Sequence, residues 1–150
     1  MLDRNLIAAR WYVGELFAED MPAIACQALE QGQDGKNLRD LAGLSSPARR
    51  DILKIVDGAF QELGVQAPIT PHDAALWMAR HLADDIVGGR TEAYAAACRI
   101  WLAYSPEAPE LEHWSDVVIN YEVEAETTGK VEKAKLQIVQ AARNLLAAVK

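Results

Sequence analysis

The residues with the clearest chemistry in this 150-residue chain are carboxylates gathered in one stretch. Between residues 100 and 129 the sequence holds seven Asp and Glu side chains and neither Lys nor Arg. They account for the whole formal net charge of -7, because the rest of the chain balances 15 acidic against 15 basic residues. A localised negative field favours a positively charged partner, and it argues against nucleic acid, whose binding depends on Lys and Arg. The seven are Glu107, Glu110, Glu112, Asp116, Glu122, Glu124 and Glu126.

Carboxylates this close in sequence repel one another, at roughly 0.2–0.5 kcal/mol for each adjacent like-charge pair on a helix. A basic protein surface would relieve that cost, so we expect a basic protein to dock on this segment. The alternative is a solvated face that serves only solubility, because salt screens exposed charges over about 10 Å. The residues that we expect to contact the partner are Glu112, Asp116, Glu122, Glu124 and Glu126.

Two tryptophans near acidic residues are candidate apolar anchors for such a partner. On a helix beginning near Pro71, a turn of about 100° per residue leaves Trp77 opposite the apolar face, in the company of Asp84 and Asp85. Trp114 lies inside the acidic stretch itself. Tryptophan is enriched at the energetic centres of interfaces, which favours an anchoring role. Alternatively, another helix or a proline-rich loop covers Trp77, because exposed tryptophan is uncommon in monomers.

The first predicted helix, over about residues 3–18, offers a related apolar feature. Ile7 and Trp11 fall on the side opposite its expected core. They are therefore candidates for joining two copies of the chain as a homodimer, or for packing against the last helix of a bundle, since bundle helices often touch two neighbours. The expected core residues of this helix are Leu6, Ala9, Val13, Leu16 and Phe17.

Patterns for metal binding and catalysis are weak. His81 precedes Asp84 and Asp85 by one helical turn, which suits surface ion pairing better than a metal site. Residues 110–113 form a single Glu-x-x-His, whereas a carboxylate-bridged di-iron bundle needs two such motifs and two further glutamates. The sequence contains no HExxH motif, phosphate-binding glycine loop, dinucleotide fingerprint or GxSxG elbow. We expect no metal, cofactor or catalytic activity, and an enzyme with an unrecognised site ranks third.

Residues 38–62 hold the second-ranked alternative, a helix-turn-helix transcriptional regulator. Residues 38–44, the Ser45-Ser46 pair and a helix opening at Pro47 have the spacing of that motif. Arg49, Arg50 and Lys54 would then face a major groove. Several acidic residues lie close by and no basic patch surrounds the second helix, so we expect no nucleic acid.

Helices must position all of these residues, because apolar spacings of three and four dominate the chain and Gly, Pro and capping residues divide it. The pattern predicts an all-α fold, a single-domain bundle of seven or eight helices over residues 1–150. One segment is ambiguous. Residues 111–126 fit an amphipathic helix, but residues 117–125 also alternate as a lone strand would and are rich in β-branched side chains. We favour the helix, since a strand would have no partner in this chain.

The remaining composition indicates where the chain resides. No apolar run approaches the roughly 20 residues of a membrane span, and the N-terminus lacks the basic and apolar regions of a secretory signal, so we expect cytoplasmic residence and no membrane contact. Cys26 and Cys98 lie far apart without CxxC spacing, and we expect both to be small buried side chains.

Three segments of the chain resemble small uncharacterised helical proteins of bacteria: residues 28–44, the later run Glu62-Leu63-Gly64-Val65, and the alanine-rich helix after Pro71. Some proteins of this kind look like immunity partners encoded beside toxins, and acidic helical immunity proteins commonly bind basic nuclease domains. The resemblance implies an immunity or antitoxin protein that neutralises a basic toxin domain. It carries over no site residue, because no functional motif aligns. The leading expectation is therefore a protein-binding module with an acidic face.

Overall fold

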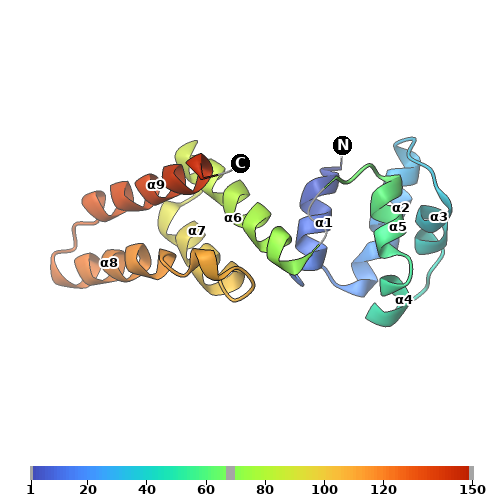
Figure 1. Cartoon of the computed structure of the whole chain (residues 1–150), viewed down its shortest axis with the longest axis horizontal. Coiled ribbons are helices and arrows are strands. Elements are labelled where there is room, and N and C mark those ends of the chain that lie inside the picture. Colours follow the sequence, from blue (N-terminus) through green and yellow to red (C-terminus); the bar gives the residue numbers. More distant parts are fainter. Residues whose placement is uncertain (1, 67–69, 149–150) are drawn as a thin grey trace. The chain divides into compact units, whose positions relative to one another are not determined.

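Every regular element of this protein is helical in the computed structural model, which describes residues 2–66 and 70–148 (Figure 1). The predicted all-α class is confirmed. Contacts divide the chain into two compact units, Met1–Ala74 and Ala75–Lys150. Whether the two units act as the single domain expected from the sequence stays a prediction, and each unit is described by itself.

The first unit is built from five α-helices. They are α1 (Arg4–Tyr12), α2 (Met21–Glu30), α3 (Lys36–Ala42), α4 (Arg49–Leu53) and α5 (Val56–Glu62), with a 3-10 turn at Ala18–Asp20 before α2. Asp3 begins α1 by accepting a hydrogen bond from the Leu6 amide at 3.1 Å. Helices α2, α3 and α5 pack together and bury one apolar cluster that also includes residues of α1.

The start of α3 depends on a side chain from α5. Glu62 accepts hydrogen bonds from the backbone N–H groups of Asn37 at 3.0 Å and Leu38 at 2.8 Å, two of the donors that a helix N-terminus leaves unpaired. Gly35 permits this approach, because a Cβ atom there would lie 2.2 Å from the Glu62 carboxyl carbon. Burial opposes ionisation of Glu62, but the hydrogen bonds from Asn37 and Leu38 outweigh it and lower the pKa of this carboxyl.

The second unit takes most of α6 (Pro71–Val87), then α7 (Ala93–Arg99), α8 (Trp114–Thr127) and α9 (Glu132–Ala147). Figure 1 shows α8 and α9 side by side, and both pack on α7. A π-helical turn, Ile100–Tyr104, continues α7, and a 3-10 turn, Pro109–Leu111, leads towards α8. The buried side chains of this unit include Ile100, Tyr104, Leu111, Trp114, Val118, Ala134, Ile138 and Ala142.

Two details of the predicted architecture are wrong. The described residues contain nine α-helices where seven or eight were expected, mainly because the helix expected after Pro47 is divided into α4 and α5 at Ile55, whose φ of -127° is not helical. Residues 117–125 form no strand, since they lie wholly within α8. Trp114 and Val118 are one turn apart on this helix and both are buried, so the 3.6-residue pattern prevails over the β-branched content.

The apolar patch expected on the first helix is also wrong. Ile7 is 9% exposed and Trp11 is 0% exposed, both within the core of the first unit, while Phe17 is 65% exposed. The physical reason is that α1 ends at Tyr12 and Gly14 adopts a φ of +83°, so residues beyond it do not continue the helical face. A homodimer joined by Ile7 and Trp11 would need both at the surface, and we drop that prediction.

The two cysteines are not both buried as expected, since Cys26 is exposed and Cys98 is half-buried, and both are free thiols. In the described ranges, no helix is both long and apolar enough to span a bilayer.

The Glu62 cap predicts a pH-dependent contribution to stability. Because the folded-state pKa is lowered, the cap stabilises the protein above the unfolded-state pKa, about 4.3 for Glu, and is lost as the pH falls through the folded value. Glu62→Gln should lower the free energy of unfolding by about 1 kcal/mol at pH 7, and by less below pH 4, as measured by urea denaturation.

The matched control is Glu30→Gln on the exposed surface of α2, which should leave stability nearly unchanged. Equal losses in both variants, or a Glu62→Gln loss that is constant with pH, would contradict the cap.

Candidate partner-binding surface

Helix α8 carries most of the acidic segment. Asp116, Glu122, Glu124 and Glu126 lie on it, and Glu112 comes just before it. The helix is fixed by its buried side, where Trp114 and Val118 are 0% and 1% exposed. Its opposite side is therefore turned to solvent.

An exposed row on α8 combines apolar and acidic side chains. Asp116, Ile119, Val123 and Glu126 follow one another at spacings of three, four and three residues, which places them along one helix face. We call these four residues the α8 stripe. Ile119 is 49% exposed and Val123 is 50% exposed. The α8 stripe thus presents two neighbouring apolar side chains with a carboxylate at each end.

Six of the seven carboxylates of the acidic segment lack cationic partners in the described part of the chain. Glu107, Glu112, Asp116, Glu124 and Glu126 form no ion pair with any residue that the structure describes, and Glu122 is bound only by a neutral phenol. All are exposed except Glu124, which is half-buried on the side of α8 near Asn120. The negative charge of these six carboxylates therefore remains uncompensated within the described chain, although it does not lie on one face only.

Glu122 is held by a contact that sequence reasoning missed. The Tyr94 hydroxyl on α7 donates a hydrogen bond to Glu122 at 2.7 Å, and the Tyr94 ring stacks on Tyr121 with centroids 4.4 Å apart. The hydrogen bond to Glu122, and a weaker one involving Cys98, raise the pKa of Tyr94. The phenol stays neutral, so Glu122 is positioned by this contact without a cationic partner. No sequence motif links these residues, because Tyr94 lies far from α8 in the chain.

Asp84 and Asp85 differ from the α8 carboxylates because they are neutralised nearby. Arg90 donates to Asp84 at 2.6 Å and to Asp85 at 2.9 Å, just after the Gly88–Gly89 turn that follows α6. The hydrogen bond to Asp85 and the charge of Asp84 raise the pKa of Arg90. None of the interactions of Asp84 and Asp85 involves α8. They are therefore poorer candidates for a basic partner than the sequence suggested.

The two candidate tryptophan anchors, Trp77 and Trp114, differ in how deeply they are buried. Trp77 is half-buried and stacks on His81, with ring centroids 5.2 Å apart and planes 10° apart, so part of its surface is already covered. Trp114 is fully buried, and its indole N–H has no hydrogen-bond partner among the described residues. The prediction of Trp114 as an exposed anchor is wrong, because this side chain fixes α8 from the inside. Ile119 and Val123, which the sequence did not single out, are the exposed apolar side chains beside the carboxylates.

One of the cations that the helix-turn-helix alternative assigns to DNA already makes a contact within the protein. The Arg49 guanidinium lies 4.3 Å from the centre of the Trp11 ring and covers it as a cation–π contact. Arg50 and Lys54 are exposed. One of the three cations assigned to a major groove therefore has a structural role in the first unit.

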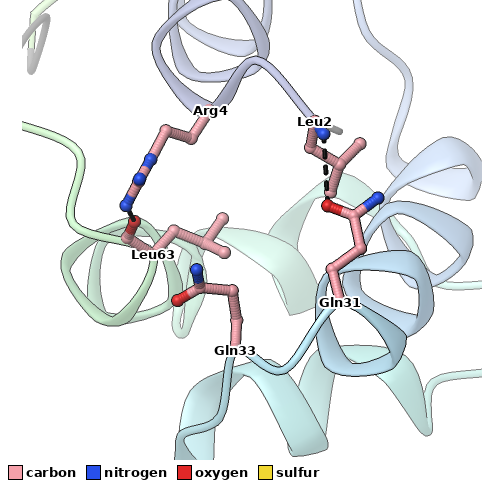
Figure 2. Close-up of a pocket in the computed structure, with 5 residues that line it drawn as sticks. All are labelled: Leu2, Arg4, Gln31, Gln33 and Leu63. Carbon is pink, nitrogen blue, oxygen red and sulfur yellow. Dashed lines mark hydrogen bonds between the residues drawn. The ribbon is translucent and has the colours of Figure 1, made fainter.

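A small cavity lies in the first unit (Figure 2). Arg4 donates to the Leu63 carbonyl at one side of it, and the Leu2 amide donates to Gln31 at 3.2 Å at the other. Gln33 lies at its edge in Figure 2. Its volume is about 80 Å³, well below the roughly 300 Å³ at which ligand pockets begin, so it suits a few water molecules.

Among the residues described, no three His, Cys, Asp or Glu side chains gather closely enough to hold a metal ion. The chain matches no protein-family model, no curated protein and no solved structure.

The buried position of Trp114 predicts a large effect on stability. Trp114→Ala should lower the free energy of unfolding by about 3–5 kcal/mol, because it empties a filled core position. Trp114→Phe should cost much less, since it keeps an aromatic ring and removes the unpaired N–H. Thermal and urea unfolding of the two variants test this. Leu136→Ala, at a position 69% exposed, is the control and should change stability by less than about 0.5 kcal/mol.

Proposed function

We propose that this chain is a protein-binding module that docks a basic protein surface on α8. The observation that carries the proposal is the α8 stripe: exposed Ile119 and Val123 lie between Asp116 and Glu126, and neither carboxylate has a cationic partner in the described part of the chain. Glu122 and Glu112 add negative charge nearby.

The carboxylates and the apolar side chains of the α8 stripe have different roles in this proposal. Uncompensated carboxylates attract a basic partner over distances near the Debye length and speed association. Ile119 and Val123 lose solvent contact only once the complex has formed, so they slow dissociation. They take the anchoring role that the sequence assigned to tryptophan.

The most concrete form of this proposal is an immunity or antitoxin protein of bacterial cytoplasm. A toxin that acts on nucleic acid needs a basic active surface, and an acidic helix face that covers this surface would block it. Support comes from the charge distribution and from the resemblance of residues 28–44 to small helical bacterial proteins.

A pair of charge variants tests the proposal. Asp116→Asn with Glu126→Gln removes two charges from the α8 stripe, whereas Glu19→Gln with Glu30→Gln removes two from exposed sites in the first unit. The wild-type chain, the stripe variant and the control variant are each used to capture proteins from a lysate at low salt. Mass spectrometry then identifies the proteins that the wild-type chain and the control capture and the stripe variant does not. The strongest of them is purified for stopped-flow kinetics.

The stripe variant should associate with this protein about three- to tenfold more slowly, with a flatter salt dependence, and Ile119→Ser with Val123→Ser should chiefly speed dissociation. If the two charge variants capture the same proteins to the same extent, the proposal fails. Binding of mixed genomic DNA at low salt, in a gel shift, would favour the helix-turn-helix alternative instead.

A further inference from the structure

The second unit contains a larger cavity that the protein-binding proposal does not use. Its volume is about 340 Å³, within the range of small-molecule sites. Arg80 of α6, Glu110 of the 3-10 turn, His113 before α8 and Asn144 of α9 supply its polar groups. These residues come from three elements and one connecting segment of the second unit, so the fold brings together side chains that no sequence motif connects.

Arg80 offers the cavity a guanidinium that no other group of the described chain binds. Arg80 lines the cavity and forms neither a side-chain hydrogen bond nor an ion pair within residues 2–66 and 70–148. A guanidinium pairs best with a planar carboxylate. The guanidinium therefore favours a ligand that carries a carboxylate.

Asn144 adds a neutral donor to the same cavity. Its Oδ1 atom accepts a hydrogen bond from Gln140 Nε2 at 2.9 Å, so its Nδ2 hydrogens remain for a ligand. Arg80 and Asn144 together can hold the two oxygens of one carboxylate.

The other two polar groups are acceptors. His113 donates from Nδ1 to the Glu110 carbonyl oxygen at 2.9 Å, so in the uncharged form of the ring the lone pair lies on Nε2. Glu110 has a further interaction within the chain, and its carboxylate, with about four lone-pair sites, can accept more than one hydrogen bond. Both groups suit an ammonium, and Glu110 balances the charge of Arg80.

We propose that this cavity binds a small aliphatic α-amino acid as its zwitterion. Arg80 and Asn144 hold the carboxylate, Glu110 and His113 hold the ammonium, and Leu76, Leu145 and Ala148 form an apolar wall for the side chain. A ligand with both charges matches all four polar groups. A ligand that carries only a negative charge would be repelled by the Glu110 carboxylate, and one that carries only a positive charge would be repelled by the Arg80 guanidinium.

Three probes with similar branched carbon chains test this site by isothermal titration calorimetry on the full chain. L-leucine carries both charges, 4-methylpentanoate only the carboxylate, and 3-methylbutylamine only the ammonium. L-leucine should bind at least about tenfold more tightly than either of the others. No heat of binding with L-leucine up to about 10 mM, or equal binding of 4-methylpentanoate, would overturn the proposal.

Two variants locate the binding. Asn144→Asp replaces a donor by a carboxylate at an exposed position, and Arg80→Gln removes the guanidinium; each should weaken L-leucine binding about tenfold or more. Arg143→Gln, on the adjacent exposed residue of α9, should leave it unchanged. Circular dichroism checks that the variants are folded. Binding that survives Asn144→Asp in a folded protein, or is lost in Arg143→Gln, would place the ligand elsewhere and refute this assignment.

Discussion

The burial of Trp114 and Val118 is the constraint on which the surface of the second unit depends. These two side chains lie one turn apart and are almost wholly enclosed, and α8 packs on α7 and α9. Because these two side chains fix the rotation of α8 about its axis, the residues on the opposite face are turned to solvent. Asp116, Ile119 and Val123 lie on that exposed face. Core packing of one tryptophan thus decides which carboxylates of α8 face solvent.

The carboxylates of this protein include some that are paired with a cation and some that are not. Some carboxylates are paired with a cation close in sequence, as Asp34 is with Arg39 at 2.5 Å and Asp84 with Arg90 at 2.6 Å. The stretch of residues 100–129 has no basic residue of its own, and the fold brings none of the described cations to the carboxylates of α8. Repulsion between such groups is a standing cost to stability, which an arriving basic surface would remove.

The sequence predicted the helical class and the acidic segment well, because both depend on local composition and spacing. It failed where the answer depends on what covers a side chain. Trp114 was named as a candidate anchor because it lies inside the acidic stretch, yet it is buried where α8 packs on α7 and α9. The prediction placed Ile7 and Trp11 opposite the core because it continued the first helix past Gly14, whereas α1 ends at Tyr12. The cavity around Arg80 and Asn144 was invisible, since its residues are distant in the chain.

The distribution of indole rings has a practical consequence. Trp11 is the only tryptophan in Met1–Ala74, and it is enclosed beneath Arg49, whereas the other three tryptophans belong to Ala75–Lys150. Fluorescence of a chain that retains Trp11 alone would follow melting of the N-terminal half selectively. Comparison with circular dichroism of the whole chain would then measure how cooperatively the two halves unfold.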